Sequence, residues 1–502
     1  MNTQQQKIGA FIADLRKQRG LTQGELAKQI HTSQSALARM ERGSQNLSVD
    51  MLTKISQALN REIVSVGSGA MSFQIQGGHK LHGSVSMSAS KNAAVGLLCA
   101  SLLNKGTTTL KRVPRIEEVY RLVEVLESIG VHCKWLKDND LRITPPEKLN
   151  FKALDAKAAS RTRSIIMFMG PFMHLADTFS IPYVGGCKLG TRTVWPHLEG
   201  LKKLGLRVKV TNVAYEVTID KRKPAEVILS EAGDTVTENV LMAAAKMDGV
   251  TVIKYASANY MVQDVCFFLQ KLGVQVEGIG TSTLTVYGKP EINMDVEYAP
   301  SEDPIEAMSF LAAAIVTNSS ITLKRCPIDF LELELLYLKN MGFKYAIKKE
   351  YLAENGQTRL VDIETKPSVL KALKDKIAPL PYPGINMDNL PFFVLVASKA
   401  KGRTLIHDWP YENRAIYYTE LNKIGGKITL LDIHRAEVDG PVEFTAADVS
   451  TPPALRPSML VLLGMLSANG TSMLRNVYSI NRGYERIAEK LNKLGARVTI
   501  VN

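Results

Sequence analysis

LESIGVHC, residues 126–133, is the first of six copies of one pattern, in which a leucine-led helix end meets a glycine and continues into a strand. The other copies are LKKLGLRV (201–208), LQKLGVQV (269–276), LKNMGFKY (338–345), LNKIGGKI (421–428) and LNKLGARV (491–498). Their glycines are separated by 75, 68, 69, 83 and 70 residues. One such turn is common in α/β proteins, but six at a near-constant period predict a duplicated α/β unit.

A second element, a helix end followed by a turn and a strand, comes before many of these copies. Examples are NKGTTTLKRV (104–113), MDGVTVIKYA (247–256), TNSSITLKRC (317–326), AKGRTLIHDW (400–409) and ANGTSMLRNV (468–477). Each unit of about 70 residues therefore holds two helices and several strands. We expect the units to form two lobes with a ligand in the cleft between them.

Composition excludes several classes of protein. The 502 residues are 45% hydrophobic and 22% charged, which is typical of a globular protein and exceeds the size of one ordinary core. No apolar run reaches the roughly 18 residues of a membrane span, and the N-terminus MNTQQQKIGA lacks the apolar block of a signal peptide, so a cytoplasmic location is expected. The five cysteines are scattered and form no CxxC pair, which predicts neither a disulfide framework nor a cysteine-rich zinc site.

Net charge is +13, of which residues 1–66 carry +4 and the remainder +9. A basic N-terminal part is typical of a segment that binds nucleic acid, and a basic remainder is typical of a protein that binds small anions. A lysine-rich solvated surface explains the same numbers equally well.

Residues 1–62 show helical spacing and no strand-like alternation. The stretch LTQGELAKQIHTSQSALARMERG (21–43) resembles the helix-turn-helix of the lambda-repressor/Cro family. That resemblance implies a DNA-binding domain over residues 1–64, followed by a Gly/Ser-rich linker at 65–72. Base edges would be read by Gln34 and Ser35, and phosphates contacted by Gln23, Arg39 and Arg42. The alternative is a small helical module used for dimerisation.

The segment GGCKLGTRTVWPH (185–197) has the most chemical content of the body. Cys187 follows two glycines and has Lys188 and Arg192 nearby, a setting that stabilises an accessible thiolate. Cys99 and Cys266 lie in apolar helices and are interpreted as core residues.

A set of motifs then recurs in a recognisable order: SASKNAA (88–94), GGCKLGTR (185–192), TENVLMAA (237–244), YENR (411–414), ALR (454–456) and NRGYERI (481–487). Over residues 73–502 they resemble the UDP-N-acetylglucosamine 1-carboxyvinyltransferase family of enolpyruvyl transferases. The resemblance implies a two-lobed inverse α/β barrel of six repeats. We expect residues 91–255 to form the lobe with the cysteine loop, and 73–90 plus 256–502 to form the other lobe.

The reaction implied is transfer of the enolpyruvyl group of phosphoenolpyruvate to the 3′-hydroxyl of UDP-N-acetylglucosamine, the first committed step of peptidoglycan precursor synthesis. By resemblance, Cys187 is the acid and Asp388 the base. The cations expected to hold phosphoenolpyruvate are Lys91, Arg163, Arg192, Arg414, Arg456 and Arg482. The residues expected to hold the UDP-sugar are Asn92, Arg192, Thr193, Val194, Trp195, Pro196, Asp388 and Tyr411. His197 is either adjacent to the site or a buried structural residue, and no metal or organic cofactor is implied.

Three positions depart from the family pattern. Ala454 stands where an Asp takes part in proton transfer, and Asp448 would replace that carboxylate only if the segment after it bends back. Ala258 stands where an Arg is expected. Trp195 replaces an Asp in the nucleotide-binding stretch.

Three hypotheses follow. The retained cysteine, base and cations favour a working enolpyruvyl transferase, which we prefer. The departures and the N-terminal domain favour a transcription regulator that senses UDP-N-acetylglucosamine or phosphoenolpyruvate without turnover. A third hypothesis keeps the reaction and changes the acceptor hydroxyl, although the cysteine loop argues against a shikimate-like acceptor.

Overall fold

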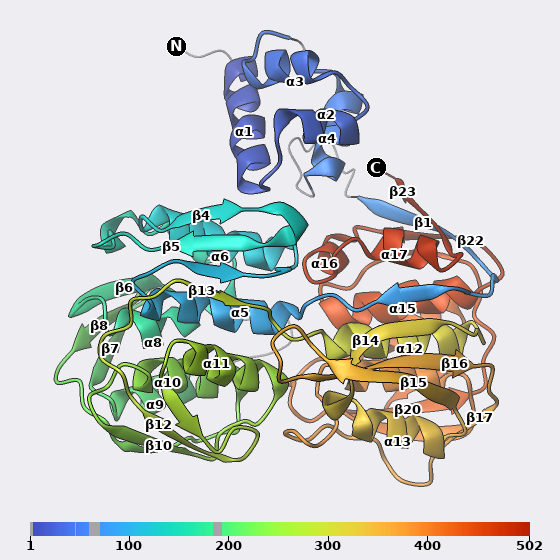
Figure 1. Ribbon diagram of the computed structural model, residues 1–502. Helices are drawn as coiled ribbons and strands as arrows, with labels where there is room; N and C mark the ends of the chain where they lie inside the picture. Colours follow the sequence, from blue (N-terminus) through green and yellow to red (C-terminus); the bar gives the residue numbers. More distant parts are fainter. Residues whose placement is uncertain (1–3, 46, 60–70, 184–192, 502) are drawn as a thin grey trace.

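The computed structural model describes residues 4–45, 47–59, 71–183 and 193–501, and Figure 1 shows a small helical head above a two-lobed body. Among the described residues, no helix is both long and apolar enough to cross a bilayer.

All six repeat glycines lie in the left-handed backbone region, with φ between +83° and +106°. Each terminates a helix, because glycine adopts this conformation without a Cβ clash. The preceding helices are α6 (Glu117–Ser128), α9 (Trp195–Lys202), α11 (Tyr260–Lys271), α13 (Glu332–Asn340), the 3-10 helix η6 (Ala415–Ile424) and α17 (Ile487–Lys493). The following strands are β4 (His132–Trp135), β7 (Leu206–Val210), β11 (Gln275–Glu277), β15 (Lys344–Leu352), β19 (Ile428–Leu430) and β23 (Arg497–Val501). The duplicated unit that the sequence predicts is therefore confirmed.

The described residues form six small sheets, and each contains one of these six strands. The sheet orders in the first lobe are β13-β3-β5-β4, β6-β8-β7 and β11-β12-β10-β9. The strands not yet bounded there are β3 (Thr108–Leu110), β5 (Leu141–Thr144), β6 (Thr178–Pro182), β8 (Ala214–Ile219), β9 (Glu226–Ile228), β10 (Val250–Lys254), β12 (Thr283–Tyr287) and β13 (Val296–Tyr298).

The sheet orders in the second lobe are β21-β22-β1-β23, β15-β16-β14-β2 and β17-β18-β20-β19. The remaining strands there are β1 (Ser72–Gly77), β2 (Ser84–Ser86), β14 (Thr322–Pro327), β16 (Arg359–Lys366), β17 (Leu370–Lys371), β18 (Ala400–His407), β20 (Arg435–Gly440), β21 (Asp448–Ser450) and β22 (Gly470–Arg475).

The two lobes exchange a strand. β2 precedes the first-lobe helix α5 (Lys91–Ala100) but pairs in parallel with β14 of the second lobe. β13 precedes the second-lobe helix α12 (Pro304–Val316) but pairs in parallel with β3 of the first lobe. The chain therefore crosses between the lobes twice.

Three helices are packed together inside each lobe. These are α5, α10 (Asp234–Ala244) and α11 in the first lobe, and α12, α14 (Leu390–Ala397) and α15 (Leu455–Ser467) in the second. α12 and α14 are buried along their whole length, since they pack against each other, against α15 and against the surrounding sheets. The short helices α7 (Ala156–Ala159), α8 (Met169–Phe172) and α16 (Tyr478–Asn481) pack against α6, α10 and α15, respectively.

The hydrophobic residues form one core per lobe. The first core runs from residue 93 to residue 298 and includes Phe330, and the second combines residues 73–87 with 305–498. Residues 256–298, which the sequence groups with the second lobe, pack in the first core. The reason is that β10 and α11 belong to one unit, which a boundary at 255 would divide.

Glu302 lies at the second crossing and is fully buried. It accepts hydrogen bonds from Arg112 Nη2 of the first lobe and Arg325 Nε of the second, each at 3.0 Å. Arg112 comes two residues after β3 and Arg325 lies within the equivalent strand β14, each in a Lys-Arg-x-Pro sequence, and both have positive φ (51° and 63°).

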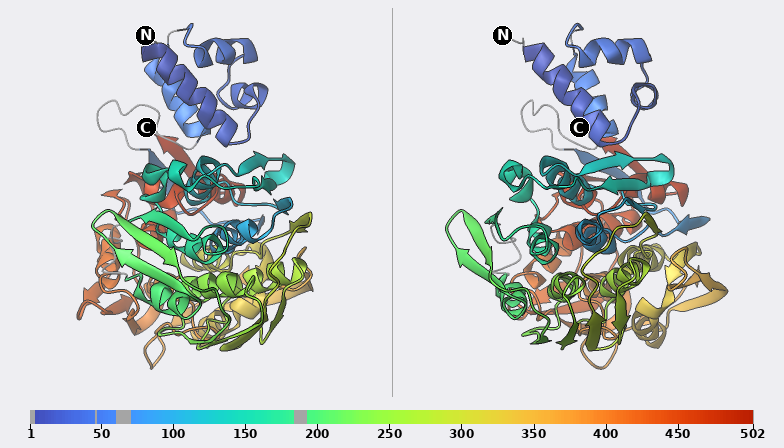
Figure 2. Two further views of the ribbon diagram at one scale, coloured as in Figure 1. Left: turned by 90° about the vertical axis from the view of Figure 1, so that its left-hand side faces the viewer. Right: turned by 60° about the vertical axis from the view of Figure 1, so that its left-hand side comes forward.

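The head consists of α1 (Gln4–Gln18), α2 (Gln23–Gln29), α3 (Gln34–Glu41) and α4 (Val49–Ala58) around a core of its own. Thr22 caps α2 through a capping box with Glu25, and Ser33 caps α3, as the sequence predicts. Figure 1 and Figure 2 show that the head rests on the layer of β4, β5 and α6, with α3 at its far end.

Candidate functional site

Four of the predicted body residues lie at the N-terminal ends of the central helices. Lys91 and Asn92 open α5, Asp388 comes two residues before α14, and Arg456 lies in the first turn of α15. Backbone N–H groups and the helix dipole make such ends favourable for anions.

Asp388 is the centre of the second-lobe part of the site. Its Oδ2 lies 3.3 Å from Arg456 Nη2 and its Oδ1 lies 3.7 Å from Arg414 Nη1. Burial alone would raise the pKa of Asp388, but the positive charges of Arg456, Arg414 and Lys91 outweigh it and bring the pKa below its usual value. The carboxylate is therefore ionised at neutral pH, as a proton acceptor must be.

Lys91 brings the first lobe to this centre. Its Nζ lies 3.6 Å from Glu118 Oε2, and the same carboxylate accepts a 3.0 Å hydrogen bond from Ser164 Oγ. Burial alone would raise the pKa of Glu118, but Lys91 and Arg482 outweigh it and the pKa is lowered. Glu118 thus fixes the position of Lys91 between the two lobes.

Arg414 differs from the prediction that it holds phosphoenolpyruvate. Its side chain is 1% exposed and forms a two-pronged ion pair with Asp408, with Nε–Oδ2 at 2.5 Å and Nη2–Oδ1 at 2.6 Å. Nη2 also donates to the Met387 carbonyl at 2.7 Å. Arg414 therefore positions Asp388 from the protein interior, and its Nε and Nη2 donors bond to protein atoms.

The other predicted cations are more accessible. Arg482 is exposed in the NRGYERI segment, and Arg163 is partly buried, donating from Nη2 to the Thr193 carbonyl at 2.9 Å. Cys187 and Arg192 lie outside the described residues.

Asn92 belongs to a hydrogen-bonded group at the start of α5. Its Nδ2 donates to the Tyr260 hydroxyl at 3.2 Å, and Ser90 Oγ donates to the same hydroxyl at 3.1 Å. Burial raises the pKa of Tyr260 well above its usual value, so the phenol stays neutral.

The stretch predicted to bind the nucleotide begins α9. Thr193 and Trp195 are exposed, Val194 is partly buried and Pro196 is buried. His197 is buried, and its ring nitrogens approach Asn239 Nδ2 at 3.1 Å and Thr235 Oγ1 at 3.4 Å, which agrees with the structural alternative. Tyr411 is buried beneath Arg414, whose Cζ lies 4.0 Å from the ring centroid.

The positions that depart from the family pattern have defined surroundings. Ala454 is buried and precedes α15 without a side-chain cap. Asp448 does not replace the missing carboxylate, because it lies on β21 in an exposed ion pair with Arg475, with Nη2–Oδ2 at 2.5 Å. Ala258 is buried at the start of α11.

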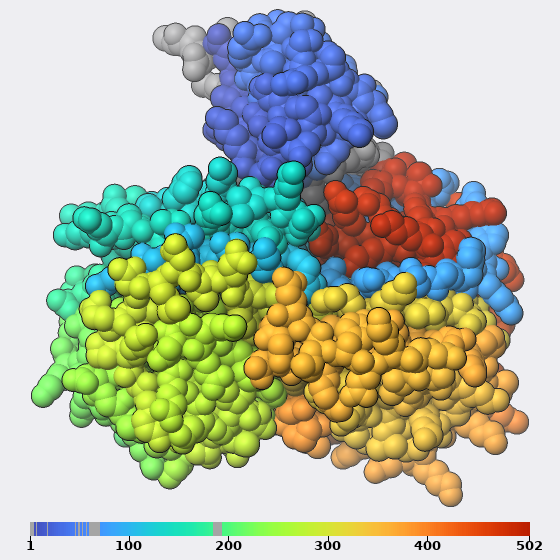
Figure 3. Space-filling model, in the orientation of Figure 1, coloured from blue at the N-terminus to red at the C-terminus, as the bar shows by residue number. Residues whose placement is uncertain are grey.

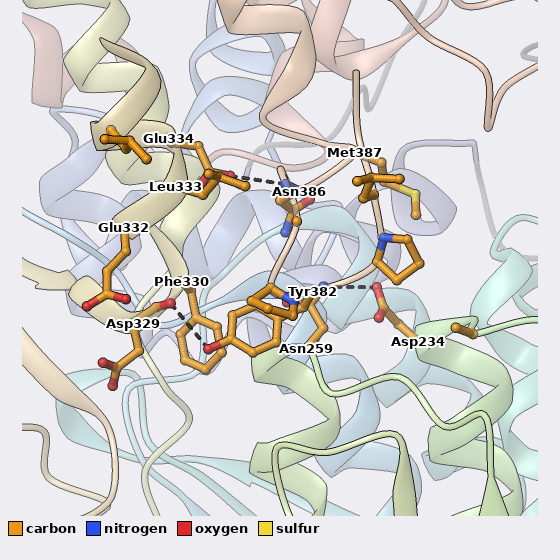
Figure 4. Close-up of a pocket in the computed structure, with 16 residues that line it drawn as sticks. Asp234, Asn259, Asp329, Phe330, Glu332, Leu333, Glu334, Tyr382, Asn386 and Met387 are labelled. Atoms are coloured by element: carbon orange, nitrogen blue, oxygen red, sulfur yellow. Dashed lines mark hydrogen bonds between the residues drawn. The ribbon is translucent and has the colours of Figure 1, made fainter. Parts of the chain in front are cut away.

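A cavity of ≈260 Å³ opens between the lobes, and its lining includes Met387, the neighbour of Asp388 (Figure 4). Asp234 and Asn259 line it from the first lobe, and the second lobe contributes residues around Phe330, Tyr382 and Met387. Four carboxyl-bearing residues face it, namely Asp234, Asp329, Glu332 and Glu334. In the described part of the chain, no cluster of three or more His, Cys, Asp or Glu could hold a metal ion.

The head presents three of four side chains that the sequence predicts to contact DNA to solvent. Gln34, Ser35 and Arg39 are exposed on α3. Gln23 is instead partly buried and donates to Glu41 Oε2 at 2.8 Å, while Glu41 also pairs with Arg16.

Comparison with known proteins places this geometry in a family. The family model of EPSP synthase (3-phosphoshikimate 1-carboxyvinyltransferase) matches residues 75–491, and a helix-turn-helix model matches residues 12–65. A UDP-N-acetylglucosamine 1-carboxyvinyltransferase of Bradyrhizobium diazoefficiens is 33% identical over 427 residues, covering 85% of this chain and 97% of that protein. The enzyme of the same name from Treponema denticola is 30% identical over 432 residues, covering 85% and 99%.

The chain belongs to the EPSP synthase family of carboxyvinyltransferases. Solved structures agree on the fold. The enolpyruvyl transferase NikO from Streptomyces tendae superposes with a TM-score of 0.73 at 21% identity, covering 86% of this chain and 99% of that one. EPSP synthase from Acinetobacter baumannii gives 0.67 at 17% identity, covering 86% and 100%. The resemblance and the fold class predicted from the sequence are confirmed, including the helix-turn-helix domain.

Sequence reasoning missed three residues that organise this carboxyvinyltransferase site. Glu118 holds Lys91, Asp408 holds Arg414, and Tyr484 accepts a 2.9 Å hydrogen bond from Arg456 Nη1. Tyr484 lies inside the quoted NRGYERI motif, and Glu118 is one of two acidic residues opening a helix, so both had a signal in the sequence. Asp408 had none.

Proposed function

We propose that this family member transfers the enolpyruvyl group of phosphoenolpyruvate to the 3′-hydroxyl of UDP-N-acetylglucosamine and releases phosphate. The observation that carries the proposal is the ionised Asp388, positioned by Arg456 and Arg414 and facing Lys91 from the other lobe. The two relatives above, each named for this activity, support the choice of substrates.

Asp388 takes the proton of the attacking hydroxyl, whose oxygen bonds to C2 of phosphoenolpyruvate while C3 gains a proton. Loss of a C3 proton and departure of phosphate then restore the enol ether, so the two substrates yield enolpyruvyl sugar and phosphate. Lys91, Arg456, Arg163 and Arg482 hold the phosphate and carboxylate. Cys187 remains our proposed acid for C3.

The cavity between the lobes suits the sugar. Its carboxyl groups accept hydrogen bonds from hydroxyl and amide donors but repel a diphosphate. We therefore place the sugar ring there. The diphosphate and base are assigned to the exposed stretch around Thr193 and Trp195, near Arg163.

The test is steady-state phosphate release by the full chain supplied with phosphoenolpyruvate and UDP-N-acetylglucosamine. Release is expected to be lost in Cys187→Ala and in Asp388→Asn, but kept in Asp448→Asn, whose carboxylate lies in a surface ion pair. Saturable UDP-sugar binding without any release would instead favour the regulator hypothesis, in which Ala454 marks a lost activity.

A second function is favoured by the head. We infer that α3 binds duplex DNA, because the confirmed helix-turn-helix domain leaves Gln34, Ser35 and Arg39 exposed. Selection from random duplexes, followed by fluorescence anisotropy at several salt concentrations, tests this. Gln34→Ala should relax base preference, whereas Arg39→Ala should weaken all duplexes and reduce the salt dependence. Equal binding by wild type and both variants contradicts the inference.

A further inference from the structure

The head is attached to the first lobe through one buried arginine. Arg19, just past the end of α1, is 3% exposed and places Nη2 2.5 Å from Glu117 Oε1 of α6. Its Cζ lies 3.3 Å from the centroid of the Tyr120 ring, and its Nε donates to the Leu59 carbonyl at 2.9 Å. One side chain thus joins the end of α1 and the end of α4 to one face of α6.

The body contributes a second arginine, Arg115, to the same contact. Arg115 donates to the Arg19 carbonyl and stacks on Trp135, with its Cζ 4.6 Å from the ring centroid. Gly20 lies against that indole so closely that a Cβ there would come within 2.1 Å of Trp135 Cβ. The contact is therefore charged and closely packed, and Figure 3 shows the head resting directly on the body.

The first turn of α6 serves this contact and the candidate active site at once. Glu117 holds Arg19 of the head, and the next residue, Glu118, holds Lys91 of the phosphoenolpyruvate site. Two adjacent carboxylates thus connect the docking contact of the head with the candidate active site.

The second lobe reaches the same turn through the NRGYERI segment. Arg482 acts electrostatically on Glu118, and Glu485 acts on Arg115. Glu485 Oε1 also accepts a 3.0 Å hydrogen bond from Asn139 Nδ2 of the first lobe. Any ligand held by Lys91 and Arg482 therefore binds beside the residues that hold the head.

We propose that anion binding between the lobes and docking of the head on α6 are coupled, each strengthening the other. The proposal rests on the phosphoenolpyruvate site proposed above. A bound anion neutralises Lys91 and Arg482, and these positive charges oppose the approach of the cationic Arg19 to α6. Because the contact is buried, salt screens this effect only weakly. Ligand binding at the transferase site thereby strengthens the docking of the DNA-binding domain on α6.

Hydrogen exchange of the full chain tests one direction of the coupling. Saturating phosphoenolpyruvate plus UDP-N-acetylglucosamine should slow exchange of the Arg19 and Leu21 amides, which bond back to α1, by about fivefold or more. In Arg19→Ala these ligands should no longer affect the head, although they still protect α5.

Ligand affinity tests the reverse direction, since coupling free energies are reciprocal. Arg19→Ala should raise the dissociation constant of phosphoenolpyruvate by the same factor that ligands slow exchange. Lys17→Ala is the matched control, because it removes an exposed positive charge from the same helix end. Gly20→Ala should act like Arg19→Ala, because it obstructs Trp135 while keeping the Arg19 charge. Exchange of the α2 and α3 amides verifies that the head remains folded in each variant.

Three outcomes overturn the coupling. If the ligands protect α5 but leave the head unchanged in wild type, the coupling is wrong while the proposed function stands. If Arg19→Ala weakens phosphoenolpyruvate binding and Gly20→Ala does not, the effect comes from the long-range charge of Arg19 and not from docking of the head. Ligands that protect neither region contradict the proposed function, and the coupling falls with it.

Discussion

The buried pair of Arg414 and Asp408 supports a prediction that separates a structural role from a ligand-binding one. Asp408→Leu leaves Arg414, 1% exposed, with the Met387 carbonyl and Asp388 3.7 Å away. Arg414→Met leaves the Asp408 carboxylate, 0% exposed, with the Tyr418 hydroxyl at 2.5 Å. Loss of one partner of a buried pair costs about 3–5 kcal/mol, and we expect the arginine variant at the upper end because Asp408 retains less.

The double variant removes both charges, so the buried Tyr418 hydroxyl loses its acceptor, at a cost of about 1–3 kcal/mol, and the part-buried Met387 carbonyl loses a donor that water replaces. The two single costs should therefore exceed the double cost by at least about 3 kcal/mol. Urea unfolding followed by the fluorescence of Trp409, the neighbour of Asp408, measures all three variants. Arg435→Met is the control, because its ion pair with Asp432 is on the surface and its loss should change stability far less.

Two results would refute this reasoning. Single costs that simply add in the double variant mean that the pair is not coupled. An Arg414→Met chain of normal stability, whose phosphoenolpyruvate affinity falls a hundredfold or more, would make Arg414 a direct ligand, as the sequence alone predicts.

Three further predictions concern the site and its pH dependence. Asp388→Asn should lower the rate of phosphate release by roughly 10²–10⁴-fold while UDP-sugar binding persists, measured by calorimetry beside the kinetics; a rate within tenfold of wild type removes Asp388 as the base. Glu118→Gln should raise KM for phosphoenolpyruvate more than it lowers kcat, because Lys91 loses the carboxylate that positions it; the pKa of Glu118 is lowered, so its ionised contribution is complete above about pH 4.5 and KM should show no titration from this group between pH 6 and 8. His174 is the third case, since burial lowers its pKa to about 4, and Nε2 lies 2.7 Å from the Ala243 carbonyl. Folding therefore favours the neutral ring, and about 2–3 kcal/mol of stability, complete above pH 6.5, should be lost as pH falls from 6.5 to 4. Urea midpoints at pH 7 and pH 5 in wild type and His174→Gln measure this, and equal pH dependence in the two chains contradicts it.

The fold was largely readable from the sequence because glycine has a physical reason to stand at each of the six helix ends. Every one of those glycines has a positive φ that other residues adopt only with strain. The strand exchange was not readable, since β2 and β13 have three residues each and nothing in so short a strand names its partner.

The sequence indicated which residues gather at the candidate site, but not where their side chains point. Motif order assigned Lys91, Asp388 and Arg456 to one candidate site, and the structure places each at or just before a helix N-terminus. A motif does not specify where a guanidinium points, so the burial of Arg414 against Asp408 emerged only from packing. The docking of the head likewise depends on Arg19, which has no distinguishing neighbours in the sequence.

The duplicated arginines at Glu302 have a mechanical consequence. One buried carboxylate oxygen accepts hydrogen bonds from Arg112 of the first lobe and Arg325 of the second, on two segments of matching sequence and backbone. Because this carboxylate is buried and charged, both hydrogen bonds are strong and resist separation of the two lobes. Lys91 and Asp388 come from different lobes, so the spacing between them depends in part on this one link.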